Sequence, residues 1–301
     1  PPDLYTRLHE VAEELDRPDA RLLALFYSER HHLSPAGRRE RVAAFDVLLP
    51  HVPADTPFGY DYLYWLRDAY VGVLLQYIEP VTAAEAVERC YLSPVADATA
   101  PSNVALMRMW AGQWEKVLEL TSPIIAAGVT RQETKYRHIA VCAAARTMVQ
   151  LERPEEALSV LELWVPEITR RGWHAPLELN TCCRAYALHA LARPAEAAEL
   201  FAALPRPFAY PPTRVMALRV ERLAGLGSDP AAAAELAADW YDARWNLTPH
   251  YLAALVEQAL REPSVDTRRD LLAHIDEHPT PLVLTYGYQA DLDKLRAELS
   301  S

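Results

Sequence analysis

The chain has 301 residues and a formal net charge of −11, and 51% of its residues are hydrophobic while 24% are charged. This composition is typical of a folded chain in water, and no apolar run reaches the roughly 20 residues that a membrane span needs. The acidic charge disfavours direct nucleic-acid binding, because a duplex is bound through a basic face that displaces counterions. The nine glycines amount to roughly 3%, against an average near 7%. So few positive-φ corners favour an all-α fold over a β-rich or doubly wound α/β fold.

The chain start and the cysteines bear on the compartment. No basic stretch followed by an apolar stretch opens the sequence, so no secretory signal is expected. The four cysteines form no CxxC pair, and we interpret them as small buried side chains in a reducing, cytoplasmic compartment. They are Cys90, Cys142, Cys182 and Cys183. The first residue is Pro1, which fits either removal of Met or a piece cut from a larger protein.

Residues 1–97 are predicted to form an irregular helical segment. Helices are expected to start at Pro18 and Pro35, because Pro costs least at the first helical position. Another start is expected at Pro80, with Thr82 as the N-cap. The segment is also rich in aromatic side chains, which either fill gaps between helices or anchor a partner. They are Tyr60, Tyr62, Tyr64, Trp65, Tyr70 and Tyr77.

Residues 98–262 contain a recurring corner. The sequence reads Leu-Glu-Arg-Pro up to Pro154 and Leu-Ala-Arg-Pro up to Pro194, and these two prolines stand 40 residues apart. The residue before Pro resists the helical region, so one helix ends there and Pro opens the next. The small Ala157 and Ala197 follow and let the two helices approach closely. Related corners surround Gly112 and Pro230, so the region is predicted to be a series of helical hairpins.

Apolar residues between the corners recur at intervals of three and four. The spacing predicts a single helical stripe over Leu158, Leu161, Val165 and Ile168. After a further helix start predicted at Glu262-Pro263, residues 263–301 are expected to form C-terminal capping helices.

The stretches around Pro154 and Pro194 resemble tetratricopeptide repeats. The family's small, small and large apolar positions read Ala145, Ala157 and Leu161, and then Ala185, Ala197 and Phe201. The spacing exceeds the family's usual period of about 34 residues, and the early Trp and closing Pro are mostly absent. Long irregular repeats of this kind look like those of bacterial signalling and transcription-activator proteins. The resemblance covers about half of the chain and implies a right-handed α-solenoid whose concave face binds peptides or protein segments without catalysis.

One candidate binding site follows from aligning the repeats at their prolines. Arg146, Tyr186 and Arg222 then fall at or near one position of successive first helices, the side that lines the inner groove in the family. Such a ladder could clamp a carboxylate or an acidic segment through forked hydrogen bonds. Arg137 and His138 lie about two turns earlier on the first of these helices. The alternative is that these side chains form inter-repeat ion pairs or a solvated face.

A second candidate is an aromatic anchor near the end of the repeats. Trp240, Arg244 and Trp245 lie close together in sequence, and Trp and Arg dominate binding hot spots. The alternative for the tryptophans is a place in the core.

The third candidate is a metal site. His274, Glu277 and His278 match the H-x-x-E-H order of inverted zinc peptidases, in which both histidines share a helical face. Pro279 ends that helix at once, and a His near a helix C-terminus also complements the helix dipole.

Taken together, the sequence predicts a non-enzymatic scaffold or regulatory module that docks a protein or peptide and needs no cofactor. Two alternatives stay open, namely a ligand-sensing domain of a larger regulator and a helical metal-dependent hydrolase built on His274 and His278. An array of this kind would also expose an apolar end, which a second copy could cap.

Overall fold

The computed structural model describes residues 2–27, 35–53, 55–56, 59–75, 78–91, 100–129, 135–204, 211–225, 229–241, 248–277 and 287–300. Every regular element in these ranges is a helix, and none of them contains a strand. The predicted all-α class is therefore confirmed. None of the described helices combines the length and apolar character that crossing a bilayer requires.

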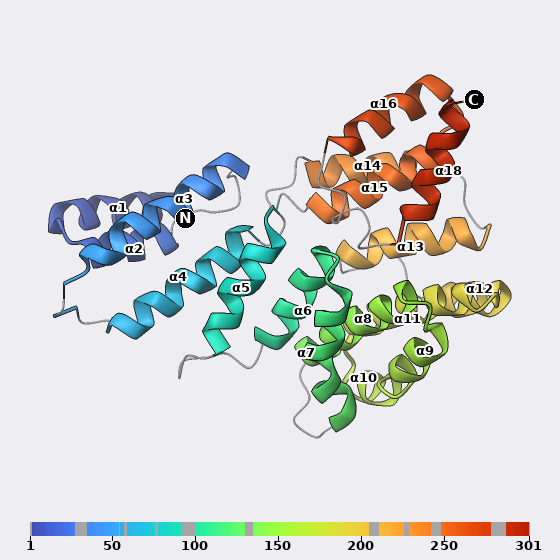
Figure 1. Cartoon of the computed structure of the whole chain (residues 1–301), viewed down its shortest axis with the longest axis horizontal. Helices are drawn as coiled ribbons and strands as arrows, with labels where there is room; N and C mark the ends of the chain where they lie inside the picture. The colour runs from blue at the N-terminus through green and yellow to red at the C-terminus, as the bar shows by residue number, and fades with distance from the viewer. Residues whose placement is uncertain are drawn as a thin grey trace. The chain divides into compact units, whose positions relative to one another are not determined.

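The described helices group into two compact units that divide at Met107, so that the division falls within α6 (Ala100–Trp110). The predicted segments 1–97, 98–262 and 263–301 stay a prediction. Figure 1 labels the helices of both units. Unit 1 contains α1 (Pro2–Leu15), α2 (Pro18–Tyr27), α3 (Pro35–Leu48), the short 3-10 helix η1 (Leu49–His51), α4 (Tyr60–Leu75) and α5 (Pro80–Tyr91). Unit 2 contains α7 (Trp114–Ala127), α8 (Lys135–Gln150), α9 (Pro154–Glu162), α10 (Val165–Arg171), α11 (His174–Ala190), α12 (Pro194–Ala202), α13 (Pro211–Leu223), α14 (Pro230–Tyr241), α15 (Thr248–Arg261), α16 (Val265–Asp276) and α18 (Gln289–Ser300).

Proline opens many of these helices, as predicted. Residues 18, 35, 80, 154, 194 and 230 are all first helical positions. Two details of the predicted starts are wrong. Thr82 is the third residue of α5 and not its N-cap, because Pro80 itself begins the helix. The helix predicted after Glu262 starts at Val265, since the Ser264 hydroxyl accepts the backbone N–H of Thr267 at 3.3 Å and caps it there.

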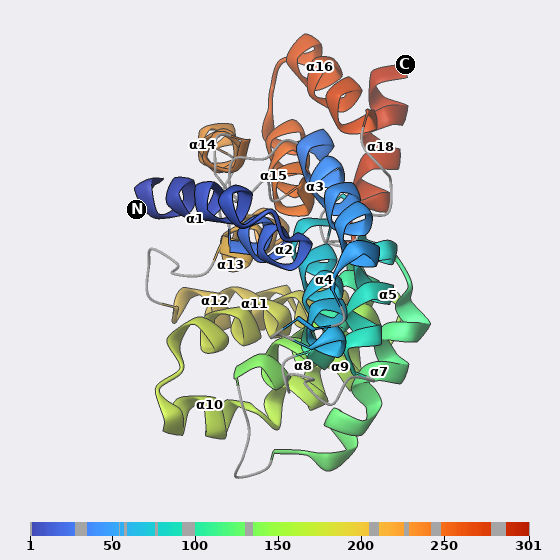
Figure 2. The ribbon, with the colours of Figure 1, turned by 90° about the vertical axis from the view of Figure 1, so that its left-hand side faces the viewer.

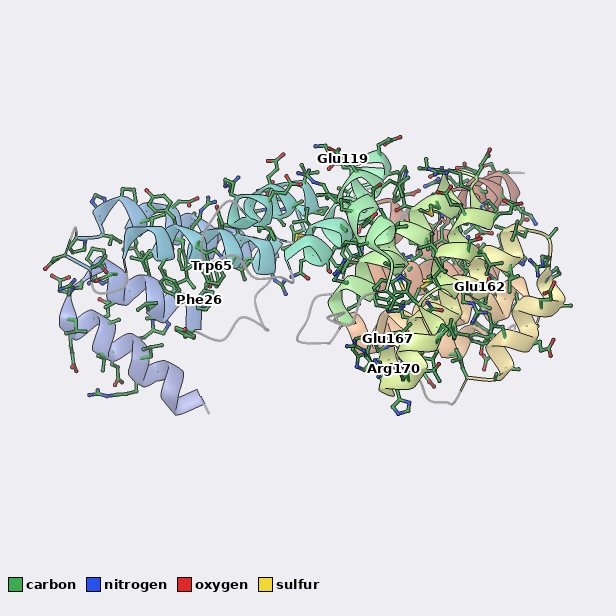
Figure 3. The ribbon with its side chains drawn as sticks, turned by 90° about the horizontal axis from the view of Figure 1, so that it is seen from below. Phe26, Trp65, Glu119, Glu162, Glu167 and Arg170 are labelled. Carbon is green, nitrogen blue, oxygen red and sulfur yellow. The ribbon has the colours of Figure 1, made fainter. Side chains whose placement is uncertain are left out.

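Unit 1 is built around the close pair α4 and α5. A Cβ on Gly72 of α4 would lie 2.3 Å from a methyl of Val87 on α5, so glycine sets the distance between the two helices. The Tyr70 ring is completely buried, and its hydroxyl donates to the Leu25 carbonyl at 2.9 Å. Tyr70 is thus a core residue, whereas the Tyr64 side chain is exposed. The positions of Phe26 and Trp65 in this unit are marked in Figure 3.

Unit 2 repeats one corner geometry between consecutive helices. Gly112, Glu152 and Ala192 all have left-handed φ angles, of 68°, 60° and 57°. In each case the next residue donates its N–H to a carbonyl five residues earlier, at 2.9, 2.8 and 2.9 Å. These are the bonds of a Schellman cap, which satisfies the last carbonyls of the first helix. The donating residue then serves as N-cap of the second helix, so one residue closes one helix and opens the next.

The apolar stripe predicted on a single helix belongs to two helices. Leu158 and Leu161 lie on α9 and Ile168 lies on α10, with the chain turning at Trp164 between them. The cause is Pro166, which cannot donate to the Glu162 carbonyl and whose ring clashes with it. The prediction of one continuous helix was wrong, although Leu158, Leu161 and Ile168 are all buried.

The first helices of successive pairs in unit 2 contact one another. α8 packs on both α9 and α11, α11 packs on α12 and α13, and α13 packs on α15. Figure 2 shows α10 at the far end of this group, below α11 and α12. The side chains that α8, α11 and α13 turn toward one another are therefore close in space although far apart in sequence.

Candidate binding site

Three polar side chains occupy one register position in α8, α11 and α13. Arg146 stands six residues before Glu152, and Tyr186 stands six residues before Ala192, each counted from the left-handed residue that ends the helix. In α13 the left-handed residue is Gly225, with φ of 68°, and six residues before it is Arg219. The structural register thus contains Arg146, Tyr186 and Arg219, and Arg222 lies one turn further along α13.

These three side chains line a recess in unit 2. Met216 and Val220 complete the lining, and the recess is small, with about 10 Å³ of space, roughly what one water molecule needs. The Arg146 and Arg219 side chains are both largely buried, at 6% and 7% exposure. A buried guanidinium loses its hydration and so favours a carboxylate or carbonyl partner. The recess thus combines two such cations with a phenol.

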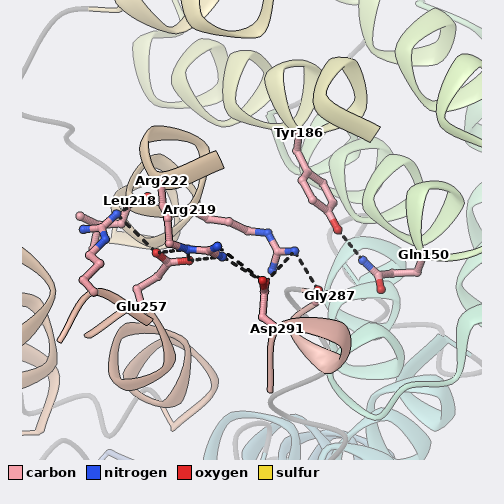
Figure 4. Close-up of polar contacts among 9 residues, drawn as sticks. Gln150, Tyr186, Leu218, Arg219, Arg222, Glu257, Gly287 and Asp291 are labelled. Atoms are coloured by element: carbon pink, nitrogen blue, oxygen red, sulfur yellow. Dashed lines mark hydrogen bonds and ion pairs between the residues drawn. The ribbon is translucent and has the colours of Figure 1, made fainter. Parts of the chain in front are cut away.

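Arg219 is the centre of the polar contacts around the recess (Figure 4). Its guanidinium carbon lies 5.0 Å from the Tyr186 ring centroid and 4.3 Å from that of Tyr288, within cation–π range of both. Its Nη2 donates to the Gly287 carbonyl at 2.8 Å. Tyr186 in turn accepts a hydrogen bond from Gln150 Nε2 at 2.8 Å.

Arg222 lies next to Arg219 and is held by two carboxylates. Its Nε donates to Glu257 Oε2 at 3.0 Å, and its Nη2 donates to Asp291 Oδ2, also at 3.0 Å. Glu257 is completely buried, and its Oε2 also lies 3.4 Å from Arg261 Nη2. Burial opposes the charge on Arg222, but the Glu257 carboxylate outweighs this effect and the pKa of Arg222 is raised. Arg222 therefore stays charged and is occupied by residues of the chain itself.

The same charges act on neighbouring titratable groups. Burial raises the pKa of the Tyr288 hydroxyl well above its ordinary value, and the Glu257 carboxylate adds to the shift. Burial lowers the pKa of His189, and the nearby Arg219 and Arg222 lower it further. Both side chains are thus neutral near pH 7. The fixed charges around the recess are those of the arginines and the carboxylates.

Arg146 lies near a second buried aromatic group. The His250 imidazole is buried and meets the Trp110 ring edge-on, with centroids 6.2 Å apart. Burial, aided by the positive charge of Arg146, lowers the pKa of His250 to about 3. His250 is therefore neutral, and Arg146 supplies the positive charge on this side of the recess.

His138 and Arg137, predicted as further groove residues, lie apart from the lining. His138 is completely buried, with its Nε2 3.2 Å from Asn180 Nδ2, and Asn180 also donates to the Leu161 carbonyl at 3.1 Å. Burial lowers the pKa of His138 to about 3. This neutral imidazole joins α8 to α11 inside the unit. Arg137 is half-buried in the first turn of α8.

The predicted aromatic anchor lies almost wholly outside the described residues. Trp240 belongs to the last turn of α14, but its side chain is not among those described, and neither are Arg244 and Trp245. The anchor stays a prediction.

The predicted metal pair is described in part. His274 lies on α16, with its Nε2 3.0 Å from the Tyr251 hydroxyl and its Nδ1 3.3 Å from Glu277 Oε2, while His278 lies outside the described residues. Over the part of the chain that the structure describes, no three His, Cys, Asp or Glu side chains are grouped closely enough to hold a metal ion. Three of the four cysteines are described, and each is a buried free thiol, as predicted for Cys142, Cys182 and Cys183.

The sequence matches no protein-family model, and no curated protein registers as a relative.

Several residues at the site escaped the sequence analysis. They are Gln150, Arg219, Glu257, Gly287, Tyr288 and Asp291. Arg219 was missed because Pro230 stands five positions after the left-handed Gly225, whereas Pro154 stands only two after Glu152. Counting back from proline therefore reached Arg222. Counting back from the glycine would have found Arg219. The other residues follow no repeat: Gln150 ends α8, Glu257 lies on α15, Gly287 and Tyr288 precede α18, and Asp291 lies in its first turn.

Proposed function

We propose that unit 2 is a right-handed solenoid of helical hairpins that docks an acidic segment of a partner protein at the recess. The repeated Schellman corner supports the solenoid, since it gives consecutive hairpins the same turn. Contacts of α8 with α11 and of α11 with α13 support it too, because a solenoid buries its apolar faces between neighbouring repeats.

One observation carries the binding role. Arg146, Tyr186 and Arg219 come from the first helices of successive pairs, stand in the same register and line one recess. Burying the two guanidinium groups costs free energy that apolar side chains would avoid, and Arg219 recovers part of it through the Gly287 carbonyl and the Tyr186 and Tyr288 rings. A carboxylate entering the recess would gain charge-assisted hydrogen bonds from the arginines and a neutral one from the Tyr186 hydroxyl.

Peptide binding tests this role directly. Acidic peptides selected from a display library against the full chain would be labelled, and their affinity measured by fluorescence anisotropy. We expect Arg146→Glu to weaken binding by about 100-fold, as is usual when one partner of a buried charge pair is lost. Removal of the hydroxyl alone in Tyr186→Phe should weaken it by about fivefold, the value of one neutral hydrogen bond.

The matched control is Arg170→Glu, which makes the same change of charge on α10, where Arg170 pairs with Glu167 (Figure 3). No lining residue comes from α10, so the affinity should stay within about twofold of the wild type, as for distant independent sites. If Arg146→Glu and Arg170→Glu reduce the affinity equally, the recess is not the binding site.

A further inference from the structure

The residues just before and within the first turn of α18 lie against the recess. The Gly287 carbonyl accepts a hydrogen bond from Arg219, and the Tyr288 ring lies against the same guanidinium. The Asp291 carboxylate pairs with Arg222. The segment 287–291 thus offers a carbonyl, an aromatic ring and a carboxylate to two neighbouring arginines. These are the groups that a bound peptide segment would offer, here supplied by the chain itself (Figure 4).

The segment fits tightly against the lining. A Cβ on Gly287 would lie 2.3 Å from Gln150 Nε2 and 2.4 Å from the Tyr186 hydroxyl oxygen. Gln150 could turn its amide aside, but the Tyr186 ring could not move without leaving the Arg219 guanidinium. Gly287 also has a φ of 70°, which disfavours other residues. Only glycine therefore allows the backbone to come this close to Tyr186.

The remainder of α18 is attached in another way. Leu292 and Leu295 are buried, and the helix packs on α15 and α16. Ion pairs at its surface join Arg296 to Asp276 and Glu298 to Arg268. The polar contacts with the recess are thus confined to its first residues, and the apolar contacts lie further along the helix.

We propose that residues 287–291 are a resident ligand of the recess, which an incoming partner segment of the same chemistry displaces. That segment carries a small residue, an aromatic residue directly after it, and a carboxylate three positions beyond the aromatic residue. The inference rests on the proposed function and adds to it the identity of the occupant. Displacement is required because both arginines already have partners from this segment. Arg219 donates to the Gly287 carbonyl, and Arg222 donates to the Asp291 carboxylate.

The test compares two glycine substitutions in the full chain. Gly287→Ala introduces the Cβ that meets Gln150 and Tyr186, whereas Gly172→Ala introduces one at a similar φ of 63° with nothing within 4 Å. The probe is a labelled synthetic peptide with the sequence of residues 287–300. We expect Gly287→Ala to bind this peptide at least tenfold more tightly than the wild type does, and Gly172→Ala to match the wild type. Amides of residues 289–300 should also exchange hydrogen faster in Gly287→Ala alone.

A second variant keeps the test decisive if Gly287→Ala fails to fold. Asp291→Arg brings a third guanidinium to Arg219 and Arg222 and should release the segment by charge repulsion. A peptide in which the positions of Tyr288 and Asp291 are changed to alanine should lose its binding to either variant. Equal peptide affinity in the wild type and both variants would overturn the proposal. A concentration-dependent dimer of Gly287→Ala would overturn the assignment to a separate partner and place a second copy's segment in the recess.

The two proposals fail in different ways. If library-selected acidic peptides bind the wild type through Arg146 while α18 stays protected from exchange, docking survives and displacement fails. If α18 opens in Gly287→Ala but neither the 287–300 peptide nor an acidic peptide binds, the docking function itself fails.

Discussion

Units 1 and 2 are both built from helices that begin at proline, yet they bury charge in different ways. In unit 1 the buried Asp19 pairs with the nearby Arg17 at 2.9 Å and accepts the hydroxyl of Thr56, and the buried Arg38 donates to the Leu74 carbonyl. These contacts are made to a side chain two residues away, to a hydroxyl and to the backbone. In unit 2 the buried Glu257 of α15 meets the half-buried Arg222 of α13 beside the recess. Unit 1 also joins charges of separate helices, as Asp46 of α3 and Arg67 of α4 do, but there the carboxylate is half-exposed, whereas Glu257 in unit 2 is completely buried.

The largest effect is expected at Glu257. Glu257→Gln leaves the guanidinium groups of Arg222 and Arg261 without their shared buried counter-charge, and should lower the free energy of unfolding of unit 2 by about 3–5 kcal/mol. The matched change in unit 1 is Asp46→Asn, which removes a half-exposed partner of Arg67 and should cost about 1 kcal/mol or less. Urea denaturation with hydrogen exchange, which separates the units, measures both. Similar losses would show that the two units do not differ in this respect.

The second-largest expected effect is a loss of stability of unit 2 at acidic pH. The pKa values of His138 and His250 are about 3 in the folded chain, against an ordinary value of 6.5. As the pH falls through 6.5, the unfolded chain binds protons that the folded chain does not, so the unfolded state is favoured until the pH reaches the folded values. Each histidine should lower the free energy of unfolding by about 1.4 kcal/mol between pH 7.5 and 5.5.

Denaturation at the two pH values measures this dependence. His138→Gln removes one titrating group, so its pH-dependent loss should be about 1.4 kcal/mol smaller than that of the wild type. An unchanged loss in this variant would mean that His138 is not a neutral buried group.

In unit 1 the sensitive feature is close packing rather than charge. Gly72→Ala would force a methyl against Val87, a stiff side chain, and should cost about 1–3 kcal/mol through overpacking. The cost should shrink in a Val87→Ala background, which makes room for the methyl. A double-mutant cycle by urea denaturation measures this coupling, and additive losses would show that α4 and α5 do not meet at Gly72.

The smallest expected effect has the opposite sign. Glu152→Gly and Ala192→Gly relieve left-handed strain at the two corners that lack glycine, and each should stabilise unit 2 by about 0.5–1 kcal/mol. Ala198→Gly, inside α12, is the matched change and should destabilise by about 1 kcal/mol. Thermal unfolding separates the three. A loss of stability in Ala192→Gly would contradict the corner geometry.

Much of the fold could be predicted from local chemistry. Proline fixes its own φ and lacks an N–H, so helix starts could be predicted at Pro154 and Pro194, and both are confirmed. The break near Trp164 was missed because the apolar period continues across Pro166 while the helix does not. The site could be predicted only where it repeats, as at Arg146 and Tyr186. Glu257 and Asp291 come from helices outside that period, so only the folded chain shows that they meet Arg222.

At the corners of unit 2, the length of the connection between two helices does not affect the register of side chains on the first helix. The left-handed residue ends the first helix before the connecting residues begin. Residues inserted after it therefore lengthen the connection but do not change which face the preceding helix turns toward its neighbours. The longer connection after Gly225 shows this, because Arg219 keeps the register of Tyr186. Insertions should therefore accumulate at these corners during evolution.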